Sequence, residues 1–481
     1  MIDAPTTRAD TPRWLDADAR ARLGRRLEEA LHRARRSGAQ TIASVTACLD
    51  HTPDPTAVVA GSRLGEEPWV CLEQPDRHGS ALAGLGVAWA IESRGSERFA
   101  SAAEQWRATV VRAAADPAQG PPGAGLVALG GFAFAPESAA APQWRGYPPL
   151  SLTVPEISLV RRDSEVWLTV NIRAAADDTL EALERRVDER LSNLECKPIP
   201  LLDPAPIGPY EVLSTMPPSH FEDAVARAVD RIRSGELVKI VLAREVQVHA
   251  PRDHDPAAVL GLLREEFRSC YVFAVGRGDA TFVAASPELL VRREGQRAST
   301  VALAGSARRS ADPAVDDHLG ERLLRSEKDL EENAIVARRI ARALTPHSVW
   351  VTAAEQPALV RVANIQHLAR PIRAQLADNP GVIELAGVLH PTPAVGAEPV
   401  TAAWRLIPAL EGMDRGWYTG AVGWTDAAGD GEFCVALRCG LLRGPVAWCY
   451  AGCGIVRDSD PAAELAESEV KLEAILPALA G

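Results

Sequence analysis

Residues 237–248 read LVKIVLAREVQV, and this stretch carries the clearest fold signal in the chain. Successive side chains of an extended strand point to opposite faces, so Val238, Ile240 and Leu242 are expected on one face and Lys239 on the other. Lysine is almost never buried without a partner. Lys239 is therefore predicted either to face solvent or a sheet edge, or to act in chemistry as a base.

The residues before this strand predict a helix and a long connection. Residues 219–222, SHFE, match a capping box ahead of an amphipathic helix that stops at Gly235. Proline is frequent in residues 197–218, which predicts an irregular linker because proline has no backbone N–H to donate. A sheet-rich half at 36–196 precedes the linker, and residues 1–35 have helical spacing.

The residues after this strand alternate between strand and helix patterns. A Gly-Asp-Gly turn at 429–431 predicts the bend of a β-meander. Strands are expected at 270–275, 281–285, 289–293, 416–424, 432–442 and 446–456, and helices at 314–344 and 461–476. These elements predict a mixed strand and helix architecture for the second half of the chain.

Composition places the chain among ordinary globular proteins. Its 481 residues include 52 basic and 64 acidic ones, and the formal net charge of -12 argues against nucleic acid as a partner. No apolar run approaches the roughly 18 residues of a membrane helix, and the N-terminus lacks the apolar region of a signal peptide. The eight cysteines include no C-x-x-C pair, which favours reduced thiols in a cytoplasmic protein over disulfides or zinc.

Glu288 is the first candidate for acid chemistry. It follows Pro287 at a break between two predicted strands and stands beside Leu289 and Leu290. A carboxyl group against apolar neighbours tends to have a raised pKa, which a general acid needs near neutral pH. The alternative is an ordinary glutamate in a turn.

Two predicted helices carry carboxylates three residues apart. Asp329 and Glu332 share one helix face, and Glu464 and Glu467 share another, with Lys471 one turn further on. If the two pairs face each other, they repel strongly unless a cation lies between them, and oxygen ligands suit Mg²⁺. The alternative for either pair is a solvated helix face.

Small residues and an arginine are candidates for anion binding. The segments 304–306 (AGS) and 452–454 (GCG) follow predicted strands, so their backbone N–H groups can approach a ligand closely. Arg438 is predicted to alternate with apolar neighbours along the strand at 432–442, with its guanidinium group on the opposite face. There it could pair with a carboxylate through two hydrogen bonds.

Ten ordered sequence blocks follow one another in the second half of the chain. They are KIVLARE (239–245), ASPELLVRREG (285–295), ALAGSARR (302–309), SEKDLEEN (326–333), QHLARPI (366–372), HPTPAVG (390–396), DRGWYTGAVGW (414–424), ALRCGLL (436–442), YAGCGIV (450–456) and ESEVKLEAIL (467–476). These blocks resemble the chorismate-utilising enzymes, and within them the isochorismate synthases of siderophore and menaquinone pathways. The resemblance spans about 219–476, and GGFAF at 130–134 is similar to the N-terminal half of the family.

The resemblance implies an α/β (α+β) fold of the anthranilate synthase component I type. In that fold two large antiparallel sheets pack face to face, helices surround them and the active site lies near the centre. We expect an N-terminal extension at 1–35 and a single chorismate-utilising domain at 36–481. The domain would consist of an N-terminal half at 36–196, the linker at 197–218 and a catalytic core at 219–476.

The resemblance also implies the reaction and its residues. Lys239 matches a base that activates water for attack at C2 of chorismate, and Glu288 matches the acid that protonates the departing C4 hydroxyl. The implied cofactor is Mg²⁺, with the ligands Glu332 and Glu467 and, beside them, Asp329 and Glu464. The residues implied to contact the substrate are Gly305, Ser306, His367, Ala394, Tyr418, Leu437, Arg438, Gly452, Gly454 and Lys471.

Several positions discriminate between reactions of the family. Ammonia-using members carry Gln where this chain has Lys239, and members with a covalent route carry a lysine where it has Ala304. Salicylate synthases, which also eliminate pyruvate, tend to have the residues found here at Tyr418 and Leu437, but Thr where this chain has Ala394. Ala394 together with the HPTPAVG and ALAGSARR blocks outweighs Tyr418 and Leu437, so isochorismate synthase is the favoured interpretation and salicylate synthase is the alternative.

The remaining expectations concern partners. A non-catalytic family member is a further alternative. The loss of any of four residues would favour it, but all four are present: Lys239, Glu288, Glu332 and Glu467. No glutaminase-like segment is visible, so neither a fused nor a separate glutaminase is expected. The chain is expected to act as a monomer in the cytoplasm on chorismate, with no nucleic acid or membrane partner.

Overall fold

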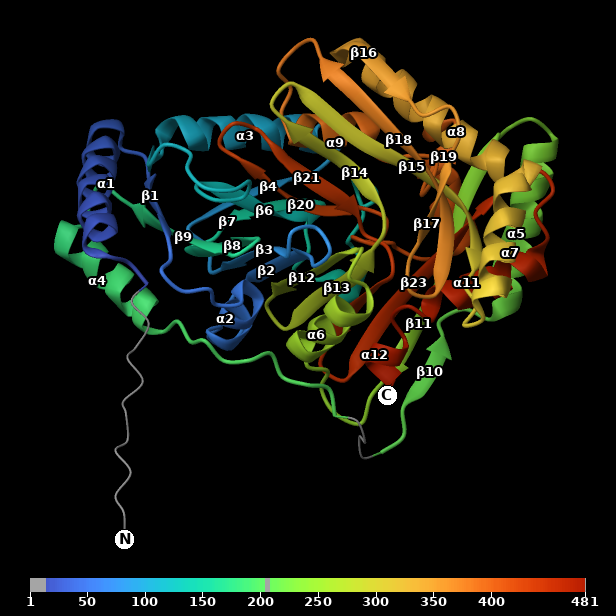
Figure 1. The fold of residues 1–481 in the computed structure, drawn as a ribbon, viewed down its shortest axis with the longest axis horizontal. Coiled ribbons are helices and arrows are strands. Elements are labelled where there is room, and N and C mark those ends of the chain that lie inside the picture. The colour runs from blue at the N-terminus through green and yellow to red at the C-terminus, as the bar shows by residue number, and fades with distance from the viewer. Residues whose placement is uncertain (1–13, 204–207, 481) are drawn as a thin grey trace.

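Two β-sheets organise the described part of the chain, which comprises residues 14–203 and 208–480 of a computed structural model (Figure 1). Among these residues the larger sheet has thirteen strands, antiparallel throughout except for the pair β1 and β5. Its order is β10 (Glu211–Ser214), β11 (Lys239–His249), β23 (Val446–Ile455), β22 (Cys439–Arg443), β13 (Ala280–Ser286), β12 (Tyr271–Arg277), β2 (Trp69–Gln74), β3 (Ser80–Leu85), β8 (Ile157–Arg162), β9 (Glu165–Ala174), β1 (Thr41–Cys48) and β5 (Ala114–Ala115), with β19 (Ala397–Glu398) paired to β11.

The smaller sheet has ten strands within the described ranges and is antiparallel throughout. Its order is β16 (Ser348–Ala353), β18 (Ile365–Leu376), β15 (Arg297–Arg308), β14 (Leu289–Glu294), β21 (Gly431–Val435), β20 (Ala421–Asp426), β6 (Val127–Phe132), β7 (Leu150–Val154) and β4 (Trp89–Ser93), with β17 (Ala358–Arg361) paired to β18.

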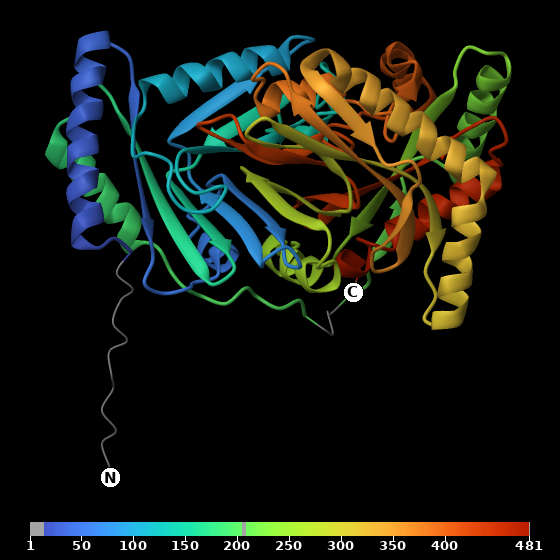
Figure 2. The ribbon, with the colours of Figure 1, turned by 45° about the horizontal axis from the view of Figure 1, so that its top comes forward.

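Helices lie outside the two sheets, with α1 and α4 at one end and α5, α7, α8 and α11 at the other (Figures 1 and 2). Their bounds are α1 (Ala17–Ser37), α2 (Pro55–Gly61), α3 (Arg98–Arg112), α4 (Leu180–Ser192), α5 (Pro218–Arg233), α6 (Pro256–Glu266), α7 (Pro313–Arg325), α8 (Glu327–Leu344), α9 (Val382–Leu389), α10 (Val400–Glu411), α11 (Pro461–Leu472) and α12 (Pro477–Ala480), with short 3-10 turns η1 (Pro142–Trp144) and η2 (Thr345–His347).

The sheets pack face to face around a shared apolar core. Phe273 and Phe282 of the larger sheet and Leu129 and Val422 of the smaller sheet are all buried in one cluster. Burial of this aromatic and aliphatic surface is the main force that holds the sheets together. The α+β fold with two packed antiparallel sheets is therefore confirmed.

The N-terminal helix α1 belongs to the packed structure. Leu23 and Leu27 are buried against Val45 of β1 in the same core cluster. Asp16 caps the helix by accepting a hydrogen bond from Ala19 N, 2.7 Å away. The predicted boundary at residue 35 stays a prediction, and residues 1–13 of the predicted extension lie outside the described residues.

Two local predictions before β11 are wrong. The capping box at 219–222 does not form, because α5 begins at Pro218 and so places Ser219 inside the helix rather than at its cap. The linker at 197–218 is not wholly irregular, because the proline-free part holds β10, which pairs with the edge of β11. Residues 204–207 of that linker lie outside the described residues.

The predicted helix at 314–344 is two helices. Ser326 has an extended backbone, with φ −71° and ψ 110°, and it ends α7. Its side chain then accepts a hydrogen bond from Asp329 N at 3.3 Å and starts α8. This break sets the direction of the helix that carries Asp329 and Glu332.

The predicted strand at 432–442 is also wrong, because the chain changes sheets within it. β21 belongs to the smaller sheet and β22 to the larger one. Arg438 lies between them with a φ of +52°, a conformation that interrupts strand geometry. Arg438 therefore does not alternate along a strand, and its side chain leaves the backbone at the passage between the sheets.

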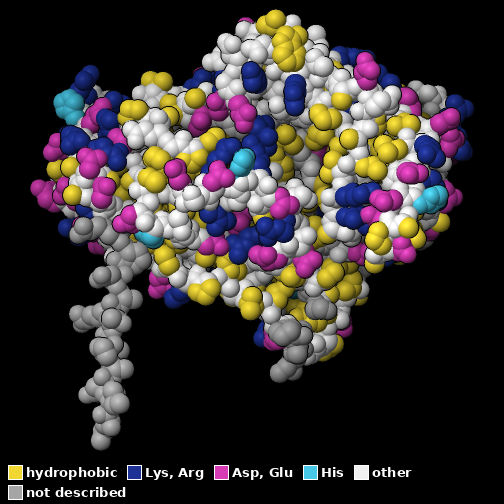
Figure 3. Space-filling model, in the orientation of Figure 1, with side chains coloured by type: hydrophobic (Ala, Val, Ile, Leu, Met, Phe, Trp, Pro, Cys, Tyr) yellow, Lys and Arg dark blue, Asp and Glu magenta, His cyan; other side chains and the backbone are white. Residues whose placement is uncertain are grey.

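Surface charge, helix apolarity and the cysteines bear on the expectations drawn from composition. On the face shown in Figure 3, acidic and basic side chains are interspersed rather than separated. Within the described ranges, no helix combines the length and apolarity required to cross a bilayer. All eight cysteines are free thiols, and six of them are buried.

Candidate active site

One pocket collects almost all of the predicted site residues. It lies where β11, β15, β18 and β23 meet helices α8 and α11. The predicted residues that line it are Glu288, Gly305, Ser306, Asp329, Glu332, His367, Ala394, Tyr418, Leu437, Arg438, Gly452, Gly454, Glu464, Glu467 and Lys471.

Lys239 lies behind this pocket rather than on its lining. Its side chain is fully buried, so the prediction of a solvent-facing lysine is wrong. Lys239 Nζ is 2.8 Å from Glu332 Oε1, a charge contact without hydrogen-bond geometry. A Cβ at position 454 would collide with Glu332 and would lie 3.0 Å from Lys239 Cε, so only glycine leaves room for this pair. Lys239 therefore does not line the pocket itself but contacts Glu332, which does.

Glu288 occupies a connection between the two sheets. It follows β13 of the larger sheet and precedes β14 of the smaller one. The backbone there is fixed by Ser286, whose hydroxyl accepts a bond from Glu288 N at 3.2 Å and donates one to Val435 O at 2.5 Å. The connection pairs with the crossing near Arg438, since Ala285 N donates to Arg438 O at 3.2 Å. Two sheet crossings thus carry two candidate functional side chains.

The carboxyl group of Glu288 is held in its neutral form. Burial raises the pKa of Glu288 to about 8, although the positive charges of Lys239 and Arg438 act in the opposite direction. No other described side chain donates a hydrogen bond to this carboxyl group. Near neutral pH it is therefore a proton donor, as a general acid must be.

Four carboxylates form the opposite wall. Asp329 and Glu332 come from α8, and Glu464 and Glu467 come from α11. Burial and the charge of Glu332 raise the pKa of Asp329, and burial and the charge of Glu467 raise the pKa of Glu464. Both shifts show that negative charge is crowded at this wall.

Lysines pair with three of these carboxylates. Besides Lys239 and Glu332, Lys471 Nζ lies 2.7 Å from Glu467 Oε1, and Lys328 Nζ lies 3.2 Å from Glu464 Oε1. Ser306 Oγ also donates to Glu467 at 2.8 Å. Burial acts to raise the pKa of Glu467, but Lys471 and Ser306 outweigh it and lower that pKa to about 2.

The chemistry of this wall fits Mg²⁺ better than a softer metal. Glu464 and Glu467 each have a ligand atom within 4.8 Å of the other and of Cys453 Sγ. However, burial raises the pKa of the Cys453 thiol well above its usual range, and the thiol donates to Glu464 O at 3.2 Å. The available donors are then carboxylate oxygens, which are the ligands that Mg²⁺ prefers.

Cationic and neutral groups line the rest of the pocket. Arg438 Nη2 is 3.4 Å from His367 Nε2, and both side chains are buried. Burial and the adjacent Arg438 lower the pKa of His367 to about 3, so its imidazole is neutral. Lys471 Nζ also donates to Gly452 O at 2.9 Å. These cations give the pocket a place for an anionic ligand beside an acidic wall.

A buried ion pair supports the wall that carries Tyr418. Arg415 Nη2 is 2.5 Å from Glu411 Oε1, and Arg415 also donates to Val395 O at 2.8 Å and to Val241 O at 3.0 Å. These bonds join three segments that line the pocket. Neither Arg415 nor Glu411 is an obvious candidate from sequence, because their spacing also matches an ordinary surface pair.

Lys328 is a charged side chain of the pocket that sequence reasoning missed. It stands one residue before Asp329 and four before Glu332, a spacing that places it on the same side of the helix. That spacing was the available signal. Lys328 contacts Glu464 across the gap between α8 and α11 and therefore belongs to the same charged wall.

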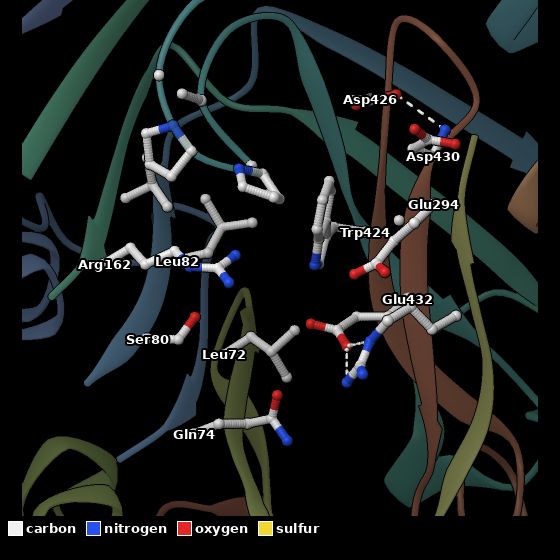
Figure 4. A pocket seen from close by; sticks show the side chains of 18 of the residues that line it. Leu72, Gln74, Ser80, Leu82, Arg162, Glu294, Trp424, Asp426, Asp430 and Glu432 are labelled. Carbon is white, nitrogen blue, oxygen red and sulfur yellow. Dashed lines mark hydrogen bonds and ion pairs between the residues drawn. The ribbon is translucent and has the colours of Figure 1, made fainter. Parts of the chain in front are cut away.

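A larger cavity of about 410 Å³ lies elsewhere and shares no lining residue with this pocket. Figure 4 shows Trp424 and Glu294 on one side of it and Leu82 and Arg162 on the other. Glu432 in its wall is bonded to Arg292 and Arg77. None of the residues predicted for chemistry reaches this cavity.

Comparisons with known proteins agree on the kind of enzyme. The family described as chorismate binding enzyme matches residues 29–480. A salicylate biosynthesis isochorismate synthase of Pseudomonas aeruginosa is 36% identical over 427 residues, which are 89% of this chain and 88% of that protein.

Solved structures give the same result for the fold. The menaquinone-specific isochorismate synthase MenF of Escherichia coli matches with a TM-score of 0.76 and 26% identity, covering 94% of this chain and 99% of that one. Anthranilate synthase component I of Streptococcus pneumoniae matches with a TM-score of 0.65 and 21% identity, covering 82% of this chain and 92% of that one. The second likeness concerns the fold alone.

Proposed function

This chain belongs to the chorismate-binding enzymes, and on that premise we infer that it is an isochorismate synthase, an isomerase that converts chorismate to isochorismate. The observation that carries the inference is the arrangement of one pocket: a buried lysine, a neutral buried glutamic acid and a wall of carboxylates. Each of these groups has a task in adding water at C2 and removing the hydroxyl group from C4.

We propose that Lys239 and Glu288 transfer the two protons of the reaction. Lys239 would accept a proton from water while the oxygen bonds to C2, the ring double bond shifts and the bond from C4 to its hydroxyl breaks. Glu288 would donate its proton to that hydroxyl, which leaves as water. The atoms balance, since one water enters and one leaves, and Lys239 and Glu288 exchange their protonation states.

The proposed cofactor is Mg²⁺. Glu332 and Glu467 would hold it, with Asp329 and Glu464 beside them, because these four carboxylates lie together on one wall. When bound, Mg²⁺ would neutralise a substrate carboxylate that the acidic wall otherwise repels. Lysines pair with three of these carboxylates and so offset part of the negative charge of the wall.

Arg438, Lys471 and the backbone at Gly452 and Gly454 are proposed to hold the other carboxylate of chorismate. Arg438 is buried and bonded only weakly to His367, so its guanidinium group has donors to offer. A Cβ at position 452 would lie 3.0 Å from the Tyr418 hydroxyl, so glycine also keeps this end of the pocket open. The remaining proposed contacts are Gly305, Ser306, His367, Ala394, Tyr418 and Leu437.

Salicylate synthase is the second candidate, favoured by Tyr418 and Leu437, and Ala394 argues against it. Pyruvate elimination requires isochorismate to be held in one conformation, and a small residue at 394 leaves the pocket wider. We therefore expect isochorismate to be released before a second step.

Product analysis tests the proposed function. The enzyme is incubated with chorismate and Mg²⁺, and isochorismate, salicylate and pyruvate are followed over time. Isochorismate should accumulate as chorismate disappears. Pyruvate and salicylate formed in step with chorismate loss would instead identify a salicylate synthase, and unchanged chorismate would identify a non-catalytic member of the family.

A further inference from the structure

Strand β15 contains an irregularity directly at the active-site pocket. Its pairing with β18 runs up to Leu303 opposite Ala369 and resumes at Ser306 opposite His367. Ala304 and Gly305 thus face Leu368 without a regular register, which is the arrangement of a β-bulge. Gly305, in the bulge, and Ser306, just after it, both line the pocket.

A single side chain from α8 satisfies the carbonyls at this bulge. Asn333 Nδ2 donates to Ala302 O and Leu368 O at 3.0 Å each, and it lies 3.4 Å from Ala304 O. Its Oδ1 accepts a bond from Arg370 Nε at 3.0 Å. Asn333 is fully buried, so all of its hydrogen-bonding capacity is used inside the protein.

The position of Asn333 on α8 connects the bulge to the acidic wall. Asn333 follows Glu332 directly and is one helical turn after Asp329, so it shares a helix face with Asp329. At that face α8 lies close against the bulge, since a Cβ at Gly305 would be 3.0 Å from Asp329 Cβ. Any slide or rotation of α8 would therefore break the bonds of Asn333 and move Asp329 and Glu332.

The acidic wall needs such an anchor because its two halves repel each other. Glu464 and Glu467 come from α11, and Ser306, just after the bulge, holds Glu467 at 2.8 Å. The bulge is thus bonded to Glu467 through Ser306, and through Asn333 to helix α8, which carries the other pair of carboxylates. Charge repulsion between the pairs acts to separate α8 from α11, and both the contact of Lys328 with Glu464 and the buried bonds of Asn333 oppose that separation.

We propose that Asn333 is a positioning residue for metal binding: by locking α8 to the bulge of β15, it fixes Asp329 and Glu332 at the distance from Glu464 and Glu467 that Mg²⁺ requires. The inference rests on the proposed function of these carboxylates as Mg²⁺ ligands. Mg²⁺ tolerates little departure from octahedral geometry, so a small shift of α8 has a large effect on its affinity. Loss of an outer-shell partner typically weakens metal binding by about 10–100-fold.

The test compares two buried asparagines. Asn171 on β9 is also fully buried and donates to Pro155 O at 2.8 Å, but it lies in the N-terminal half and touches no residue of the pocket. Asn333→Ala and Asn171→Ala are titrated with Mg²⁺ alone by calorimetry, beside the wild-type protein, at a temperature where near-ultraviolet circular dichroism shows all three folded. Asn333→Ser, which keeps one hydroxyl donor, replaces Asn333→Ala if the alanine variant does not fold.

We expect the Asn333 variant to bind Mg²⁺ about 10–100-fold more weakly and Asn171→Ala to bind it within about twofold of wild type. Turnover of the Asn333 variant should recover to within a few-fold at saturating Mg²⁺, with the KM for chorismate little changed. Unchanged Mg²⁺ affinity in the Asn333 variant, or equal losses in both variants, would overturn the inference. A wild-type protein that binds no Mg²⁺ would overturn the metal assignment itself, and the two failures are therefore distinguishable.

Discussion

Glu288 and Glu467 are the same kind of residue in two opposite environments of one pocket. Glu288 is buried and burial raises its pKa to about 8, whereas Glu467 keeps 35% of its side chain exposed and Lys471 and Ser306 lower its pKa to about 2. Glu467 belongs to a wall where lysines pair with three of the four carboxylates. Glu288 stands at a sheet crossing where no described side chain donates a hydrogen bond to its carboxyl group. Environment alone thus makes one carboxyl group an acid and the other an anionic ligand.

The largest expected effect is on kcat and comes from replacing Glu288, the proposed acid. Glu288→Gln keeps the shape of the side chain but cannot give up a proton, so kcat should fall by about 10²–10⁴-fold. Mg²⁺ affinity should stay within about twofold of wild type. The matched control is Glu73→Gln, which changes a buried glutamate on β2 that is also shifted toward the neutral form. Full turnover by Glu288→Gln would show that another group protonates the leaving hydroxyl.

Replacing Glu467, the proposed anionic ligand of Mg²⁺, should give the complementary result, a loss of metal binding. Glu467→Gln deletes a charge from the proposed Mg²⁺ site, so Mg²⁺ affinity should fall at least about 10-fold, measured by calorimetry with the metal alone. Glu469→Gln on the same helix is the control, since Glu469 is mostly exposed. If the two variants bound Mg²⁺ equally well, Glu467 would not be a ligand.

The dependence of turnover on pH should report the acid. Glu288 must be protonated to act, so kcat should decline as pH rises through about 8. That decline should be absent from the residual activity of Glu288→Gln, whatever its size. A wild-type profile that stays flat from pH 7 to pH 10 would argue against a titrating carboxyl group in the chemical step.

The sequence predicts much of the contrast between Glu288 and Glu467. It does not predict the burial of Lys239, and the reason is physical. The apolar neighbours of Glu288 indicated a raised pKa, and the three-residue spacing of the carboxylates indicated two faces of one acidic wall. The burial of Lys239 could not be derived, because a single lysine in an apolar strand fits an edge position equally well. Its burial depends on Glu332, which is 93 positions later in the sequence.

The sheet crossings were the second element that sequence patterns concealed. Residues 432–442 alternate as one long strand, but the chain leaves one sheet at Val435 and enters the other at Cys439. Periodicity reports which side chains are buried, not which sheet buries them. Because Arg438 lies at that crossing, its direction into the pocket depended on the three-dimensional arrangement of both sheets.

Stability should respond to the two glutamates with opposite signs. The folded-state pKa of Glu288 is raised, so its contribution to stability is lost as pH rises from about 4.5 through about 8. At pH 9 without Mg²⁺, Glu288→Gln should therefore raise Tm by roughly 2–4 °C, because it removes a buried charge. Glu467→Gln should lower Tm under the same conditions, since it leaves Lys471 buried without its partner. Shifts of the same sign in both variants would contradict the comparison.

The protonation state of Glu288 can be measured directly by infrared spectroscopy. The carbonyl stretch of a protonated carboxyl group is followed from pH 5 to pH 10 in the wild-type protein, Glu288→Gln and Glu467→Gln. The account predicts a protonated buried carboxyl that titrates near pH 8 in the wild-type protein, is absent from Glu288→Gln and persists in Glu467→Gln. A wild-type protein without a carboxyl that titrates near pH 8, or a component near pH 8 that is unchanged in Glu288→Gln, would contradict it.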